Sequence, residues 1–256
     1  MIRKFRISTS FILVFMVLAI LWGCEPKVPE DTRPIAKGFI WEATSIRGEV
    51  VTLVGTMHPG PNTHILLTDK LKEILNNSEI LTVEVDTIAA GNMGKLQKSI
   101  YLKDGDTVEN YLSSEEISKL NEILKPYKQK IDSIKKLNAS GINQIISSNE
   151  LSEIGFTGSS TDALLLIEAK KNKIEVDEIE DVDFQINLVN DIYTWDSLKE
   201  YISTYNDDSK NKALEIASKL FHNYVNSDVD AAEKLEASLR AEEGEVYNVL
   251  NIARKK

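Results

Sequence analysis

The first hydrophobic feature of the chain is an uninterrupted apolar run at residues 11–22 (FILVFMVLAILW), preceded by a short segment with Arg3, Lys4 and Arg6 and no acid. A helix of this length rises about 18 Å at roughly 1.5 Å per residue, which is too short for the ~30 Å hydrocarbon core of a bilayer. A basic start followed by a short apolar run is typical of a secretory signal peptide. The pattern therefore predicts export rather than a membrane-spanning helix.

The apolar run ends near the only cysteine of the chain, Cys24, which directly follows Gly23. The stretch from Leu21 to Cys24 resembles the bacterial lipobox, in which a small residue precedes a cysteine that is lipidated and becomes the mature N-terminus. We therefore expect residues 1–23 to be a lipoprotein signal peptide. Residues 24–36 are rich in proline and charge, which is typical of a tether between membrane and domain. The alternative is an unmodified, buried or reactive thiol at Cys24.

Beyond the tether, residues 38–43 and 49–55 are strand-like, and a turn containing Gly48 separates them, which predicts a β-hairpin. Residues 63–76 place apolar side chains at helical spacing, and residues 80–86 (ILTVEVD) form the next strand-like run. Strand, loop, helix and strand in this order predict a βαβ unit with parallel neighbouring strands. The core residues expected on these two strands are Val51, Leu53, Leu81, Val83 and Val85.

From residue 108 onward the pattern is mostly helical. Helices are predicted over residues 113–124, 131–148, 160–172, 183–189, 196–205, 210–225 and 229–241. The short alternating run at 174–180 predicts one more strand. The chain has no internal repeat, so we expect one α/β domain over residues 37–256. It should combine a mixed sheet, a βαβ unit and a large helical portion.

Composition and charge exclude two classes of protein. The formal net charge is −10 and no long basic stretch follows the tether, which argues against nucleic acid as a partner, because phosphate attraction needs positive charge. A single cysteine excludes an intrachain disulfide and a zinc site made of cysteines alone. The oligomeric state is not determined by these features.

Few residues are suited to chemistry, and the three histidines differ in their surroundings. His58 follows the apolar strand at 49–55, at the carboxyl end of a core strand, where α/β folds place their sites. His64 begins the next predicted helix and is a weaker candidate for the same loop. His222 lies among aromatic residues on a predicted helix, and we interpret it as structural. For His58 the alternative is a histidine held by an ordinary loop hydrogen bond.

Glu84 is a second unusual residue, because its neighbours in the strand at 80–85 are apolar. A carboxylate in a buried strand must be paired, protonated or bound to a metal. If the strands of His58 and Glu84 are adjacent, both side chains reach one cleft and begin a divalent-metal site or an acid–base pair. Two ligands are too few for a metal, so Asp86 or a distant residue would have to complete the site. The alternative is a salt-bridged structural Glu84.

Three stretches together resemble the opening of the TraB/GumN family, which is grouped with the Tiki Wnt-cleaving metalloproteases and the erythromycin-esterase-like and ChaN-like proteins. They are GFIWEA at 38–43, VTLVGTMH at 51–58 and LTVEVD at 81–86. Weaker matches follow: the G.D..Ll..A helix of the family at 161–166 (TDALLL), its LE…Q segment at 179–185, and the run before its RN motif at 228–250.

The resemblance implies a metal-dependent, hydrolase-like site with a divalent metal ion as cofactor. In it His58 and Glu84 would be catalytic or metal-binding, and the family arginine would fall on Arg254. The sequence departs from the family pattern at Lys255, which replaces the asparagine of the RN motif, and no second Gly-x-x-His occurs within the 256 residues. We therefore expect a truncated reading frame, a fragment or a member that has lost catalysis.

Two functions from different classes follow. The first is a membrane-tethered metallo-hydrolase that acts on peptides, with His58 and Glu84 beside the metal. The second is a catalytically inactive lipoprotein that keeps the fold and binds a peptide or protein partner. The family pattern favours the first, and the missing second histidine favours the second.

Overall fold

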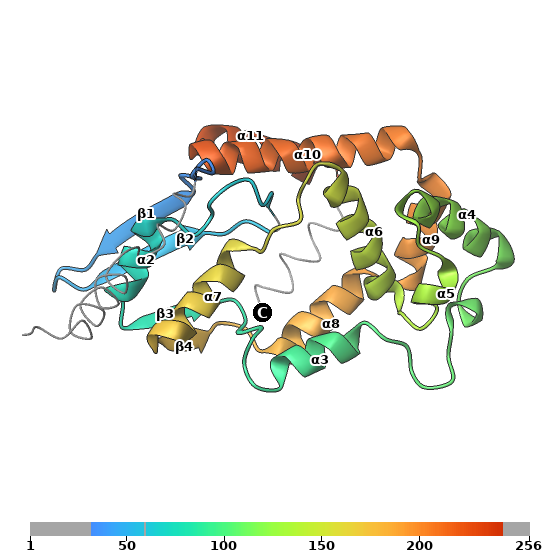
Figure 1. Cartoon of the computed structure of the whole chain (residues 1–256), viewed down its shortest axis with the longest axis horizontal. Coiled ribbons are helices and arrows are strands. Elements are labelled where there is room, and N and C mark those ends of the chain that lie inside the picture. The colour runs from blue at the N-terminus through green and yellow to red at the C-terminus, as the bar shows by residue number, and fades with distance from the viewer. Residues whose placement is uncertain (1–31, 59, 243–256) are drawn as a thin grey trace, which may run out of the picture. The chain divides into compact units, whose positions relative to one another are not determined.

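The predicted hairpin is present at the start of the domain. The computed structural model describes residues 32–58 and 60–242, and from Pro34 onward these belong to one compact unit (Figure 1). Strands β1 (Phe39–Thr44) and β2 (Val50–Gly55) pair antiparallel. Gly48 lies in the turn with a φ of 87° and donates its N–H to the Ser45 carbonyl at 3.0 Å. This left-handed backbone favours glycine, so the turn residue itself helps to fix the hairpin.

The second sheet joins distant parts of the chain. Strand β3 (Ile80–Val83) pairs in parallel with β4 (Glu175–Glu178), which confirms the strand predicted near residue 174. The prediction that β2 and β3 are neighbours is wrong for the described residues, because β2 pairs with β1 and β3 pairs with β4. Two parallel neighbouring strands need a long crossover connection between them. The crossover that starts after β3 ends at β4, so β4 rather than β2 is the parallel neighbour of β3.

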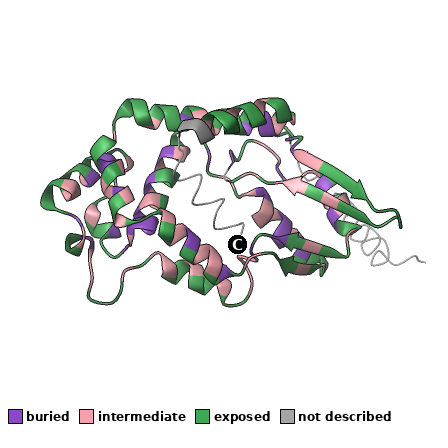
Figure 2. Cartoon of the chain, turned by 180° about the vertical axis from the view of Figure 1, so that it is seen from behind, coloured by how far each residue is buried: buried purple, intermediate pink, exposed green. Residues whose placement is uncertain are grey.

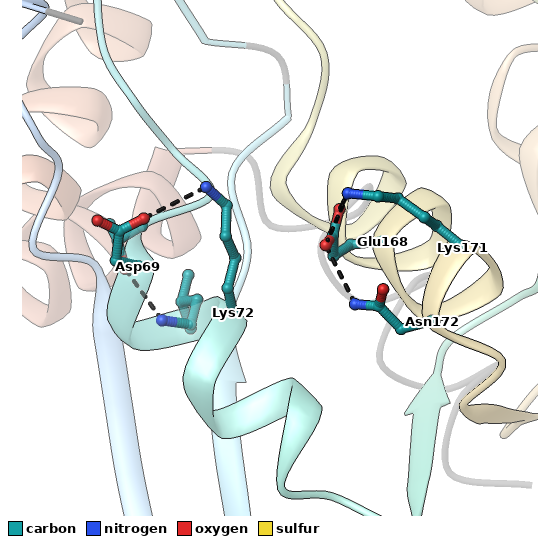
Figure 3. Close-up of polar contacts among 7 residues, drawn as sticks. Asp69, Lys72, Glu168, Lys171 and Asn172 are labelled. Atoms are coloured by element: carbon teal, nitrogen blue, oxygen red, sulfur yellow. Dashed lines mark hydrogen bonds and ion pairs between the residues drawn. The ribbon is translucent and has the colours of Figure 1, made fainter. Parts of the chain in front are cut away.

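Helices α2 (Asp69–Asn76) and α7 (Thr161–Asn172) pack against each other and against both sheets. Leu75 of α2 lies in a buried cluster with Leu165 and Ala169 of α7. At the ends of the two helices, the Asn172 amide donates to the side-chain oxygen of Asn76 at 2.8 Å. Figure 3 shows the polar contacts along both helices, which lie largely within each helix and therefore add little to the packing.

The burial pattern corrects part of the predicted core. The apolar residues expected on the strand of Glu84 lie inside or half inside: Leu81, Val83 and Val85. Val51 and Leu53 of β2 are 58% and 59% exposed, so their assignment to the core was wrong. Figure 2 shows the β1–β2 hairpin coloured as exposed or intermediate along its length. Successive side chains of a strand point to opposite faces, and it is the Val54 face of β2 that packs against the α2–α7 cluster.

A separate hydrophobic core lies among four helices, each of which overlaps a predicted helix. They are α4 (Ser114–Leu124), α5 (Ile131–Ile134), α6 (Ala139–Glu153) and α9 (Trp195–Thr204). Leu120, Ile142, Ile146 and Ile202 are among its buried members. Gly141 lets α6 approach the segment around Ile100 closely, because a Cβ on residue 141 would lie 2.7 Å from the Ile100 carbonyl oxygen.

Two predicted helices begin later than expected, and a capping side chain gives the reason in each case. α2 starts at Asp69 rather than at residue 63, because Thr68 accepts the N–H of Leu71. The helix expected over 131–148 is interrupted, and α6 restarts at Ala139, because Asn138 accepts the N–H of Gly141. Each cap ties the first turn of its helix and ends the preceding segment.

The remaining elements complete the mixed α/β fold that the sequence predicts. Short 3₁₀ turns are η1 (Val108–Asn110) and η2 (Lys125–Tyr127), and the other helices are α3 (Asn92–Ser99), α8 (Val182–Ile192), α10 (Asp207–Asn226) and α11 (Val229–Glu242). α3 was not predicted. Phe221 and Tyr224 of α10 pack with Ala36, Leu66 and Phe156. None of the described helices is long and apolar enough to cross a membrane.

Candidate functional site

Two loops that are far apart in the sequence meet just beyond the end of β2. Met57 donates its N–H to the Thr161 hydroxyl at 3.3 Å, and Thr161 donates its own N–H to the Met57 carbonyl at 3.1 Å. Gly158 donates to the Gly60 carbonyl at 2.8 Å, and a Cβ on Gly158 would lie as close to that oxygen. These contacts hold the next residue after Met57, which is His58, beside the first turn of α7.

His58 forms an ion-pair contact with Asp162, in that first turn. Nε2 of His58 lies 2.7 Å from Oδ1 of Asp162, and the two side chains are 58% and 26% exposed. Oδ1 is shielded from water and has no aligned hydrogen-bond partner among the described residues, so its short contact with Nε2 is an ion-pair contact. The Ser160 hydroxyl donates to Oδ2 at 3.1 Å, and the Thr56 hydroxyl lies 3.3 Å from Nε2. A carboxylate at this position is also favoured by the N-terminal end of the helix dipole.

Each partner shifts the pKa of the other. The hydrogen bond with Asp162 raises the pKa of His58 above its ordinary 6.5 although burial opposes it, and the charges of Asp162 and Glu84 raise it further. Burial would raise the pKa of Asp162, but the hydrogen bond and charge of His58, with smaller help from the Ser160 hydroxyl, bring that pKa below its ordinary 3.8. The charged pair is thus the favoured state of the site at mildly acidic pH.

Glu84 and Asp86 follow β3 and have different surroundings. The side chain of Glu84 is exposed rather than embedded in a buried strand as predicted, because the described residues leave the Thr82–Glu84 face of β3 uncovered. Its charge still raises the pKa of His58, so the two residues share one electrostatic environment. Asp86 instead forms an ion pair with Lys170 of α7 at 3.0 Å. It is therefore held at α7 and is not joined to His58.

A comparison with known families supplies the assignment. Residues 39–256 match the TraB/PrgY/gumN family. The chain belongs to this family. The match starts at the first residue of β1 and includes the His58 loop and α7, so both halves of the site are parts of the family domain. No curated protein and no solved structure matches the chain.

Asp162 is the site residue that the sequence reasoning missed. It is the acid within the stretch that resembles the G.D..Ll..A helix of the TraB/GumN pattern, so a signal was present. The resemblance marked the helix without indicating which loop its first turn meets. In the folded chain, the hydrogen bonds between Met57 and Thr161 join the first turn of α7 to the His58 loop.

The metal centre implied by the TraB/GumN resemblance is not completed by the described residues. Within residues 32–58 and 60–242, no three His, Cys, Asp or Glu side chains lie close enough together to hold a metal ion. His58 contacts Asp162, and Asp86 contacts Lys170. Among the described residues, the donor set for a metal is therefore incomplete. A divalent metal stays a prediction from the family resemblance, while the acid–base chemistry of the site rests on side chains that are present.

The other candidate residues lie away from this pair or outside the described part of the chain. The ring of His64 meets Phe221 edge-on, with centroids 5.0 Å apart. His222 is exposed on α10 and contacts Asn226, which agrees with its interpretation as a structural residue. Cys24 and Arg254 lie outside the described residues. Lipidation and a role for the family arginine therefore stay predictions.

Proposed function

We propose that this member of the TraB/PrgY/gumN family is a hydrolase in which His58 is the general base and Asp162 is its positioning residue. The observation that carries the proposal is the 2.7 Å contact between His58 Nε2 and Asp162 Oδ1. A carboxylate only accepts hydrogen bonds, so it holds the proton of the neutral imidazole on Nε2. Nδ1 then keeps its lone pair, and none of the described residues is hydrogen-bonded to it.

The proposed step is proton transfer from water to Nδ1. As the water oxygen attacks the carbonyl carbon of an amide, His58 takes the proton and Asp162 stabilises the imidazolium. Collapse of the tetrahedral intermediate breaks the C–N bond, and the imidazolium returns its proton to the leaving amine. The raised pKa of His58 suits both transfers, since a general base works best with a pKa near the operating pH.

We further propose that the chain acts at a membrane surface, anchored through a lipidated Cys24, on extracytoplasmic peptides. The support is in the sequence: the basic start, the short apolar run and the Gly23-Cys24 pair. Each buried acyl methylene contributes about 0.8 kcal/mol, so two or more chains hold a protein stably on a bilayer. Peptides are proposed as substrates because of the family resemblance.

The hydrolase proposal is tested with the full chain and a complex peptide mixture, in which new termini are identified by mass spectrometry. His58→Ala should slow cleavage by about 10²–10⁴-fold, the range expected for loss of a general base. Asp162→Asn should also slow it, because an amide neither stabilises the imidazolium nor fixes the tautomer. His222→Ala is the matched control and should cleave like the wild type, since His222 is an exposed helix residue.

Two results would reject the proposal. One is a wild-type chain that yields no new termini beyond those of a blank sample. The other is cleavage that persists at the wild-type rate in His58→Ala. Either result would favour the second function, binding without hydrolysis.

A further inference from the structure

A cavity of about 430 Å³ lies beside the start of β1, and the proposed reaction does not use it. Seven successive residues from Ile35 to Trp41 line it, together with Lys70 of α2 and Val229 at the start of α11. Ile35 and Trp41 are apolar side chains that remain 62% and 48% exposed. The volume is in the range of ligand sites, roughly 300–1,000 Å³. Its walls therefore offer apolar surface to a ligand.

Within residues 32–58 and 60–242, β1, the strand that lines this cavity, also has one edge that pairs with no other strand. The hydrogen bond from Ser45 N–H to the Glu49 carbonyl continues the register of the β1–β2 ladder. Hydrogen-bonded and non-hydrogen-bonded pairs alternate in an antiparallel ladder. The backbone N–H and C=O of Trp41 therefore point toward β2, whereas those of Ile40 and Glu42 point away from it. No described backbone group pairs with these outward groups. Such an edge can accept one more strand.

Two lysines add positive charge to the cavity. Lys37 and Lys70 both line it, and neither forms an ion pair with a described residue. Lys72, two residues further along α2, is different, because its ammonium group lies 3.3 Å from the Asp69 carboxylate (Figure 3). In a chain with a formal net charge of −10, two unpaired lysines beside apolar walls favour a ligand that is both apolar and acidic.

We infer that the free edge of β1 and this cavity bind an extended acidic peptide segment of a partner protein as an added strand. The outward groups of Ile40 and Glu42 hydrogen-bond its backbone, and an apolar side chain enters the cavity. An acidic side chain or a terminal carboxylate pairs with Lys37 and Lys70. Main-chain bonds supply affinity in this mode, and the pockets for alternate side chains supply specificity. The binding does not depend on hydrolysis at His58.

The inferred binding site and the His58–Asp162 pair are connected through Tyr224. The Tyr224 hydroxyl lies 3.2 Å from that of Thr161, which precedes Asp162. A Cβ on Gly38, which lines the cavity, would lie 3.2 Å from the same Tyr224 hydroxyl. One buried tyrosine thus contacts residues of both sites. A peptide held at β1 is thereby kept near the candidate site, without touching it.

The first test measures binding of a fluorescein-labelled peptide of alternating valine and aspartate to the full chain by fluorescence anisotropy. The Lys37→Glu/Lys70→Glu variant should weaken binding about tenfold or more, because it places like charges at the contact. The Lys98→Glu/Lys103→Glu variant makes the same change in net charge elsewhere and should bind like the wild type. Equal binding by both double variants, or equal binding of a valine–lysine peptide, would overturn the inference.

The second test asks whether the backbone edge is used. Ile40→Pro removes an outward N–H of β1, whereas Thr52→Pro removes the corresponding N–H on the opposite edge of β2; only the first should abolish binding. A peptide methylated on alternate backbone nitrogens tests the same bonds without altering the protein, and it should not bind. Binding of that peptide at the strength of the unmodified one would overturn the inference, even if Ile40→Pro failed to fold.

Discussion

At the scale of single residues, His58 obtains its chemical character from Asp162. The pKa of His58 is raised above 6.5, so its contribution to stability is present below pH 6.5 and is lost as pH rises through the folded-state value. The pKa of Asp162 is lowered below 3.8, so its contribution is present above pH 3.8 and is lost as pH falls through the folded-state value. The pair therefore stabilises the fold most between these two pH values.

Asp162→Asn tests this coupling directly. The variant should lower the pKa of His58, because it removes both the hydrogen-bond acceptor and the negative charge that favour the imidazolium. The pKa is measured by NMR titration of the imidazole protons. In urea unfolding, the wild type should have a larger free energy of unfolding than the variant. This difference should be largest near about pH 5 and smaller above about pH 7. A titration of His58 that is unchanged in the variant would contradict the assigned contact.

At the scale of elements, the two apolar strands that look alike in the sequence have different roles. Val83 of β3 is 8% exposed, whereas Leu53 of β2 is 59% exposed. β3 is covered by α7, the helix that precedes its partner strand β4, whereas the described residues cover β2 on the face of Val54 alone. Apolar character alone does not tell a covered strand face from an uncovered one.

Val83→Ala and Leu53→Ala form a matched pair that measures this difference. Val83→Ala should lower the free energy of unfolding by about 1–3 kcal/mol, through lost burial and a cavity. Leu53→Ala removes a larger side chain, yet should change it by no more than about 0.5 kcal/mol, because that side chain is already largely in water. Both values come from denaturant unfolding. A greater loss in Leu53→Ala would mean that the hairpin face is covered.

Gly141→Ala and Gly94→Ala test helix crossing in the same way. Alanine is favoured over glycine in a helix by about 1 kcal/mol, so Gly94→Ala in α3, where a Cβ meets nothing within 4 Å, should stabilise the protein. Gly141→Ala should destabilise it by about 1–3 kcal/mol, because the Cβ would lie 2.7 Å from the Ile100 carbonyl oxygen. Thermal unfolding compares them. Stabilisation by both changes would show that α6 is not packed this closely.

At the scale of the whole molecule, the family domain extends over residues 39–256 and so makes up most of the chain, whose formal net charge is −10. α6 and α7 connect its parts, because α6 contributes to the helical core and to the cluster around Phe156, and α7 contributes to that cluster and to the one with α2. The site lies where α7 begins. Its position depends on these connected cores rather than on any one element.

Membrane anchoring is also a property of the whole chain, and Cys24→Ser tests it. In cells supplied with a labelled fatty acid, the wild type should incorporate the label and sediment with membranes, because the lipidated cysteine is the proposed anchor. The variant should lack the label and either leave the membrane fraction or persist as an uncleaved precursor. A serine variant of a membrane-distant position, Ala43→Ser, is the control. Equal labelling of Cys24→Ser and wild type would reject lipidation.

The sequence by itself determined the local elements and the family. The hairpin around Gly48, the capped helix at Ser114, the strand at β4 and the family motifs were all predicted, because turn geometry, helix caps and side-chain period act over a few neighbouring residues. Of the proposed active site, the sequence found His58 and the electrostatic neighbour Glu84.

Only the tertiary structure decided how those elements combine. It paired β3 with β4, selected the Val54 face of β2 for packing, and brought Asp162 to His58 through the bonds between Met57 and Thr161. Each of these choices depends on closing a long loop and on which surfaces remain to be covered. Such choices have no periodic signal in the chain, because their free energy comes from contacts between residues far apart in sequence.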